Sequence, residues 1–377
     1  MVSKGLEGVI AAETAISEVN GEEGRLIYGG YLIEDLAQHA TFEEVCHLLW
    51  YGELPNQSRL DELRDRFRSA APVPAPVLEL IRTLPPGTHP MAALRTAVSA
   101  LAAYDPDSED NSPAANDRKA VRLTAQVITI TAAIERLRHG LDAIPPRPHL
   151  SLAGNLLFMM SGREPEPLSE RIIDASLTLH AEHGMNASTF AARVTAGTLS
   201  DMHSAVTSAI GTLKGPLHGG ANEQVMRMLL AIGEPERAEQ YVREALRRGQ
   251  RVMGFGHRVY RTLDPRAPLL RELAEQLERT RGSSPWLRIS SIIQRVMAEE
   301  MAGRGKKVYP NVDFFSASVY YTLGIPLDLF TTLFACARMA GWTAHVIEQL
   351  QDNRLIRPGS NYRGPRDRNV QPIAQRV

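Results

Sequence analysis

The stretch that decides the fold is "LDLFTTLFACARMAGWTAHVIEQL", residues 327–350. It is apolar around almost its whole circumference, with a few polar interruptions, among them Arg338. A helix that is apolar on every side is buried inside a protein, because a surface helix keeps one polar face toward water. The stretch therefore predicts a largely buried helix.

Helical spacing continues in the segments on either side of this stretch. "TFEEVCHLLWYG" (41–52) opens with a Thr41/Glu44 capping box and stops at Gly52. "SDMHSAVTSAIGTLKG" (200–215) predicts a helix that begins with a cap at Ser200 and ends at Gly215. Three more segments place apolar residues on one helical face: 58–67, 126–137 and 222–233. With no convincing alternating strands and no repeat of fixed period, the predicted fold is mostly or wholly α.

The bulk properties exclude several classes of protein. A chain of 377 residues is long enough for two domains, and its net charge of −1 creates no general attraction to nucleic acid or anionic membranes. Cys46 and Cys336 are too few for a disulfide framework, and neither has metal-ligand spacing. The first residues lack a signal-peptide core, and no apolar run is long enough to span a bilayer. We expect a soluble cytoplasmic protein.

Two histidine motifs are candidate sites. In "LHAEHGMNAS" (179–188), His180 and His183 share a helix face if the helix extends that far; a zinc deaminase is excluded because no Pro-Cys-x-x-Cys follows. The alternative is ordinary hydrogen-bonded packing. In "LKGPLHGGANEQVM" (213–226), glycines flank His218 directly before a helix, as for a hydrogen-bond donor or acid–base group. The alternative is a loop histidine without a chemical role.

The motif "MGFGHRVYRTLDPR" (253–266) combines a glycine loop with a histidine and several arginines. Gly254 and Gly256 precede His257. Backbone amides in such a loop, together with the arginines, suit a phosphate or carboxylate ligand, whereas the alternative is a solvated basic face. The arginines that follow His257 are Arg258, Arg261 and Arg266.

Two charged residues stand in apolar surroundings. Asp313 in "GKKVYPNVDFFS" (305–316) is interpretable as a helix cap, a buried ion-pair partner or a base. Arg338 is costly to bury without a partner, so it predicts either a structural salt bridge or an anionic ligand.

Taken together and in this order, the motifs resemble citrate synthase from about Gly5 to about Gly364. The resemblance rests on "LHAEHGMNAS", "KGPLHGGANE", "GFGHRVYRTLDPR", "YPNVDFFS" and "NRLIRPG". It implies an all-α fold with a large domain (1–217 and 319–377) and an inserted smaller domain (218–318). It also implies an acyltransferase of the tricarboxylic acid cycle, without cofactor or metal, that condenses acetyl-CoA with oxaloacetate and hydrolyses the thioester to citrate and CoA.

The same resemblance implies a role for each matching residue. Asp313 is expected to remove the methyl proton, His218 to bind the thioester oxygen, and His257 to polarise and protonate the oxaloacetate ketone. The oxaloacetate oxygens are expected to be held by His183, Arg266, Arg338 and Arg357. The expected CoA-binding residues are Arg261, Lys306, Gly254 and Gly256.

The resemblance further implies a homodimer in which the tail arginine, Arg357, completes the partner's site, and a domain closure that assembles the site. Because the family-like region begins almost at once, we expect no NADH control. A 2-methylcitrate synthase using propionyl-CoA is the nearest alternative, since one methylene changes discrimination by only about 1–3 kcal/mol. A non-catalytic acyl-CoA-binding or scaffold protein predicts a broken catalytic set, whereas His218, His257 and Asp313 are all present.

Overall fold

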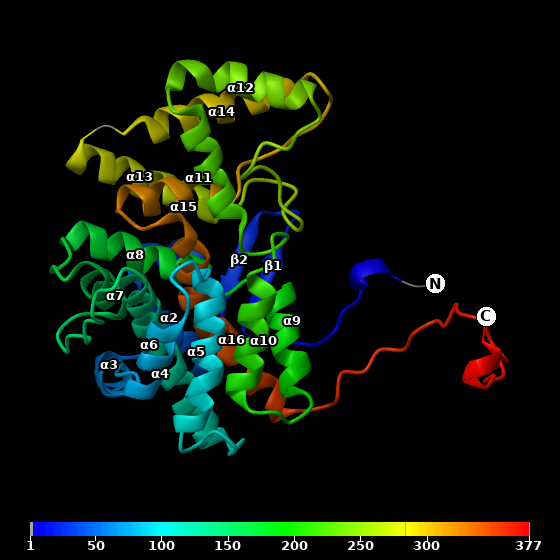
Figure 1. The fold of residues 1–377 in the computed structure, drawn as a ribbon. Coiled ribbons are helices and arrows are strands. Elements are labelled where there is room, and N and C mark those ends of the chain that lie inside the picture. The colour runs from blue at the N-terminus through cyan, green and yellow to red at the C-terminus, as the bar shows by residue number, and fades with distance from the viewer. Residues whose placement is uncertain (1–2, 283, 377) are drawn as a thin grey trace.

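The computed structural model describes residues 3–282 and 284–376, and helices make up most of them. Five helices lie together at one end of the molecule (Figure 1): α11 Ala221–Ile232, α12 Pro235–Arg247, α13 Arg266–Arg281, α14 Pro285–Ala302 and α15 Val312–Thr322. The remaining helices form the larger body: α1 Ile33–His39, α2 Phe42–Tyr51, α3 Gln57–Ala70, α4 Ala75–Thr83, α5 Pro90–Leu101, α6 Pro113–Arg138, α7 Leu152–Ser161, α8 Pro167–His180, α9 Ala187–Ala196, α10 Met202–Leu213 and α16 Phe330–Gln351. The all-α class is confirmed.

The predicted central helix is α16. Its residues from Phe330 to Val346 are almost all buried, because α2, α6, α8, α9 and α10 pack around it. Residues 327–329 of the predicted segment form a 3-10 turn that leads into the helix. Short 3-10 turns also occur at Lys4–Leu6, Ala102–Tyr104 and Ile373–Gln375. Among the described residues, no helix is long and apolar enough to cross a membrane.

A small antiparallel sheet near the N-terminus was not expected from the sequence. Its strands are β1 Ser17–Asn20, β2 Arg25–Tyr28 and β3 Tyr31–Leu32, in that order. Ser17 pairs with Tyr28, and Asn20 pairs with Arg25 across the turn. Figure 1 shows β1 and β2 between the larger body and the group α11–α15. The hairpin therefore lies where the two groups of helices approach each other.

The helix boundaries confirm most of the cap predictions. Thr41 and Glu44 form the capping box of α2, and Gly52 ends the helix with a φ of +78°. The prediction of Ser200 as a cap is wrong: Asp201 caps α10 because its carboxylate accepts from the Ser204 amide at 2.8 Å. The helix ends at Leu213, two residues before the predicted Gly215.

Candidate active site

Asp313 lies in the first turn of α15, and Asn311 sets its position. The Asn311 side chain caps the helix by accepting from the Asp313 amide at 3.1 Å, so the interpretation of Asp313 as the cap is wrong. Asn311 also donates from its amide to the Gly254 carbonyl at 2.9 Å and from Nδ2 to the Gly256 carbonyl at 3.0 Å. The glycine loop is therefore bound directly to the start of the helix that carries Asp313.

Gly254 has a packing reason to be glycine. Its φ is +79°, and a Cβ there would lie 2.7 Å from Phe314 Cδ2 and 2.9 Å from Val225 Cγ2. Any side chain would push the loop away from α15 and so displace Asp313. This explains Gly254 without reference to CoA, so CoA binding by Gly254 and Gly256 stays a prediction.

The Asp313 carboxylate is available for chemistry. Among the described residues it forms no ion pair and accepts no hydrogen bond, which removes the interpretation as a buried ion-pair partner. Burial raises its pKa to about 6, while the positive charge of Arg266 opposes that rise. A carboxylate of higher pKa is a stronger base, and it is still ionised at neutral pH.

His218 lies in the loop between α10 and α11 and is held by Ser188 at the start of α9. Its Nε2 accepts from the Ser188 amide at 3.3 Å and lies 2.8 Å from the Ser188 hydroxyl. Because a backbone amide can only donate, the ring proton is on Nδ1. Burial, with a smaller effect of Arg338, lowers the pKa of His218 to about 4. His218 is therefore a neutral donor through Nδ1.

His257 has the opposite tautomer. Its Nδ1 accepts from the amides of Val259 at 3.1 Å and Tyr260 at 3.2 Å, so its proton is on Nε2. Burial and the charge of Arg266 lower its pKa to about 4. The His257 ring centroid is 5.2 Å from that of His183.

The pair His180 and His183 is separated by the end of α8. The helix stops at His180, so the two side chains do not share a helix face. His180 Nδ1 lies 2.7 Å from the Ser176 carbonyl, the ordinary hydrogen-bonded packing that was the alternative interpretation. His183 Nε2 instead lies 3.1 Å from the Tyr260 hydroxyl, and burial holds the pKa of His183 well below its usual value.

Two arginines are almost fully buried near these groups. Arg266 is 2% exposed and makes two hydrogen bonds to Asp264, at 2.9 and 2.8 Å, so the interpretation as a solvated basic face is wrong for it. Arg338 is 1% exposed, donates from Nε to the His180 carbonyl at 2.7 Å and lies 4.7 Å from the Phe334 ring centroid. No carboxylate in the described residues forms an ion pair with Arg338, so the predicted structural salt bridge is absent.

Three predicted binding residues lie outside this group of buried side chains. Arg261 and Lys306 are exposed, and only their backbone amides make hydrogen bonds in the described structure, to Gly21 and Met301. Arg357 is exposed on the tail that extends away from the helices after α16 (Figure 1). Their predicted roles remain predictions.

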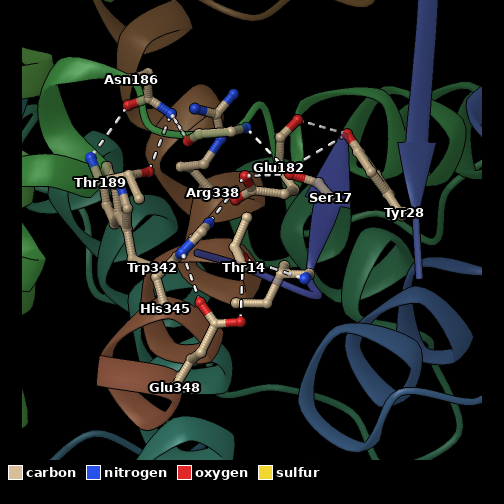
Figure 2. Close-up of polar contacts among 12 residues, drawn as sticks. Thr14, Ser17, Tyr28, Glu182, Asn186, Thr189, Arg338, Trp342, His345 and Glu348 are labelled. Atoms are coloured by element: carbon tan, nitrogen blue, oxygen red, sulfur yellow. Dashed lines mark hydrogen bonds and ion pairs between the residues drawn. The ribbon is translucent and has the colours of Figure 1, made fainter. Parts of the chain in front are cut away.

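The residues that hold the site together were not predicted from the sequence. Ser188 and Asp264 lie inside quoted motifs, and Asp264 was recognisable as a carboxylate two residues from Arg266. Glu182 is completely buried, with hydrogen bonds to Ser17 at 3.0 Å and His345 at 3.1 Å, as Figure 2 shows. Tertiary contacts of this kind leave no local pattern in the sequence.

The fold and the site together fit an all-α acid–base enzyme for an anionic substrate. The group consists of a carboxylate with a raised pKa, neutral histidines with fixed tautomers, and a buried guanidinium that has no carboxylate partner among the described residues. Within residues 3–282 and 284–376, no three His, Cys, Asp or Glu side chains are arranged to hold a metal ion.

Comparison with known proteins identifies the family. The sequence profile described as "Citrate synthase, C-terminal domain" matches residues 5–359. The chain is 47% identical to "Citrate synthase 2" of Bacillus subtilis over 100% of this chain and 99% of that one. It is 44% identical to the "Citrate/2-methylcitrate synthase" of the same organism, over 97% of each chain. The crystal structure of citrate synthase from Pyrobaculum aerophilum superposes with a TM-score of 0.94 at 42% identity, covering 100% of this chain and 95% of that one.

The protein belongs to the citrate synthase family, whose members are acyltransferases. The resemblance inferred from the motifs is confirmed.

Proposed function

We propose that the protein is a citrate synthase in the strict sense: it condenses acetyl-CoA with oxaloacetate and hydrolyses citryl-CoA to citrate and CoA. The observation that carries the proposal is the contrast in protonation within one site. Asp313 has a pKa of about 6, whereas His218 and His257 have pKa values of about 4. At neutral pH the site therefore offers one ionised carboxylate base and two neutral imidazole donors.

In the first step, Asp313 removes a methyl proton from acetyl-CoA. This carbon acid is far weaker than a carboxylic acid, so the enolate oxygen needs stabilisation as its charge develops. His218 supplies a hydrogen bond from Nδ1–H, the nitrogen left free by the Ser188 contact. Loss of one such donor costs about 10²–10³ in rate.

In the second step, the enol carbon attacks the oxaloacetate ketone. His257 donates from Nε2–H and transfers its proton to the ketone oxygen as the carbon–carbon bond forms. His183 binds oxaloacetate oxygens, and Arg266, Arg338 and Arg357 hold its carboxylates. Guanidinium groups orient a dicarboxylate as well as neutralise it, which makes a bimolecular step effectively intramolecular. Water then hydrolyses the citryl thioester and releases CoA as its thiol.

CoA is proposed to lie along the glycine loop. Gly254 and Gly256 have positive φ values of +79° and +81°, which turn the loop backbone at the start of α15. Arg261 is an exposed cation five residues after Gly256, and Lys306 is an exposed cation four residues before Pro310, which pairs with Phe255 of the loop; both are proposed to bind the CoA phosphates.

The division into a large domain (1–217 and 319–377) and a small domain (218–318) is proposed together with a closing movement. Its support is that α11–α15 pack mainly on one another. Asp313, His218 and His257 then belong to the small domain or its edge, whereas His183 and Arg338 belong to the large one. Closure excludes water and protects the thioester from premature hydrolysis.

A homodimer is proposed in which Arg357 completes the neighbouring site. The support is that Arg357 is exposed on a tail directed away from the body of its own chain (Figure 1). Mixing inactive Arg357→Ala and His257→Ala subunits tests it, because mixed dimers regain one intact site. Confirmed mixed dimers without any regained activity would assign the tail to its own subunit.

2-Methylcitrate synthase is the second candidate, favoured by the similarity to the Bacillus subtilis protein named for both activities. Acetyl-CoA is preferred here because the greater similarity is to a relative named for citrate alone. The deciding measurement is kcat/KM for acetyl-CoA against propionyl-CoA.

The test of the function is thiol release from acetyl-CoA with and without oxaloacetate. We expect release only with oxaloacetate, and none from Asp313→Ala, although that variant still binds oxaloacetate in calorimetry. Near-normal turnover by Asp313→Ala would refute the assignment of the base.

A further inference from the structure

The base of the β1–β2 hairpin is hydrogen-bonded to the backbone on both sides of His183. Tyr28 donates from its hydroxyl to the Glu182 carbonyl at 2.7 Å and accepts from the Glu182 amide at 3.1 Å. Ser17 accepts from the Gly184 amide at 3.2 Å. Ser17 and Tyr28 are a cross-strand pair. One rung of the hairpin therefore holds the residues immediately before and after His183.

The side chain of Glu182 extends this attachment into the central helix. Its Oε1 accepts from the Ser17 hydroxyl and lies 3.1 Å from His345 Nε2 in α16, as Figure 2 shows. His345 Nδ1 is in turn 3.0 Å from Arg193 Nη1, which donates to Glu348 at 2.6 Å. The backbone amide of Ala15, just before β1, also donates to Glu348 at 2.9 Å. The base of the hairpin is thus attached to α16 at two points: through Glu182 to His345, and through the Ala15 amide to Glu348.

The turn of the same hairpin contacts the loop that carries His257. The Gly21 carbonyl accepts from the Arg261 amide at 2.9 Å. A Cβ on Gly21 would lie 2.2 Å from the Val259 carbonyl oxygen, so the two backbones touch directly. The amide of the same Val259 holds His257 Nδ1. The turn therefore contacts the residues that set the tautomer and position of His257.

We propose that the β1–β2 hairpin is a positioning element of the active site, which sets the place of the His257 loop relative to His183 when the two domains are closed. Ser17 and Tyr28 are positioning residues for His183, and Gly21 is the contact point for the His257 loop. The inference rests on the proposed function, because it assumes that both histidines bind oxaloacetate. The inference assigns a role to the β1–β2 hairpin although none of the hairpin's side chains is proposed to contact the substrate.

The two ends of the hairpin have separable kinetic effects. Tyr28→Phe removes one hydroxyl and leaves the Glu182 amide and carbonyl unpaired, so we expect KM for oxaloacetate to rise roughly tenfold while kcat changes less. Gly21→Ala forces the His257 loop away, and a displacement of about 1 Å can lower kcat by about 10²-fold. In Tyr28→Phe, KM for acetyl-CoA stays within about twofold of the wild-type value. Gly21→Ala also raises KM for acetyl-CoA, because Arg261, a proposed CoA ligand, is bonded to Gly21 through its amide and moves with the loop.

Two matched variants serve as controls. Gly87→Ala adds a methyl where a Cβ meets no atom within 4 Å, and Tyr104→Phe removes a hydroxyl from a half-exposed tyrosine. Both are expected to keep wild-type kinetics. Ser17→Thr, which retains the hydroxyl, should preserve KM for oxaloacetate better than Ser17→Ala, a difference that a general loss of stability would not produce.

The outcomes separate this inference from the proposed function. If His257→Ala is inactive but Tyr28→Phe, Ser17→Ala and folded Gly21→Ala all keep wild-type constants, the positioning role is refuted and the site stands. If His257→Ala turns over normally, the proposed site itself fails. If Gly21→Ala does not fold, Tyr28→Phe and the Ser17 pair decide: a selective rise in KM for oxaloacetate supports the role, and unchanged or equally altered constants refute it.

Discussion

Arg266 and Arg338 are both buried arginines of the same site, yet their surroundings differ. Arg266, the first residue of α13, has its own counter-ion, Asp264, at 2.8 Å. Arg338 lies within α16 and donates from Nε to a backbone carbonyl, without a carboxylate ion-pair partner in the described structure. Removing one partner of a buried ion pair is strongly destabilising, and a buried charge without a counter-ion is costly in itself. Under the proposed function, Arg266 therefore serves both the fold and the ligand, whereas Arg338 serves the ligand alone.

The largest expected effect is that of Arg266→Met on stability. The substitution leaves the Asp264 carboxylate buried and unpaired, so we expect the free energy of unfolding to fall by about 3–5 kcal/mol. Asp264 also accepts from the Val312 amide at 3.3 Å, so the start of α15 should loosen with it. Urea denaturation measures the loss, with the exposed Arg288→Met as control. If Arg266→Met has wild-type stability, the Arg266–Asp264 pair does not stabilise the start of α15.

Arg338→Met should give the opposite result. Removing an unpaired buried cation leaves stability unchanged or slightly raised, because the methionine side chain fills similar space. We expect kcat/KM for oxaloacetate to fall about 10²-fold or more, since a desolvated charged contact to the substrate is lost. If Arg338→Met loses as much stability as Arg266→Met, the proposed difference between the two arginines is refuted.

The pH dependence of activity sharpens the comparison further. Asp313 acts as a base only when ionised, and its pKa is about 6, so kcat/KM for acetyl-CoA should fall about tenfold per pH unit below that value. Positive charge from Arg266, and to a lesser extent from Arg338, lowers the pKa of Asp313. Without the Arg338 charge, the pKa of Asp313 should rise, so the residual activity of Arg338→Met should begin to fall at a higher pH than that of the wild type. An acid limb near pH 4 instead would point to the histidines.

The smallest expected effect is a gain in stability for Asp313→Asn. The pKa of Asp313 is raised in the folded state, so its ionised form is disfavoured by folding above about pH 6, and the penalty vanishes below its unfolded value. The neutral amide removes that penalty. We expect a gain of about 1–3 kcal/mol at pH 8 and almost none at pH 4, measured by thermal unfolding at both pH values. Equal changes at both pH values would exclude a charge effect.

The sequence predicted the helices well because their signals are local. The Thr41/Glu44 capping box and the apolar stripe of α11 are both complete within one segment. The hairpin was missed because β1 (Ser-Glu-Val-Asn) and β2 (Arg-Leu-Ile-Tyr) do not alternate polar and apolar residues. Its Ser17 and Tyr28 are held by residues about 155–165 positions further along the chain.

The candidate site residues were named from their motifs, and their roles stay predictions; the electrostatics of these residues were not predicted. Asp313, His218, His257 and Arg338 were all identified from their motifs. The cap of α15 is Asn311, two residues before Asp313, whereas only Asp313 was considered as a cap from the sequence. Which arginine is paired, and which nitrogen of each histidine is free, depends on contacts that only the folded chain makes.

The donors that fix the two histidine tautomers are main-chain amides of Ser188, Val259 and Tyr260. Amides are unchanged by almost every amino-acid replacement, and only proline deletes one. Evolutionary drift at positions 259 and 260 can therefore alter the side chains around His257 without moving its proton to the other nitrogen. The backbone path therefore determines which nitrogen of His218 and of His257 carries the proton, and the same tautomers should persist in relatives whose local sequences have diverged.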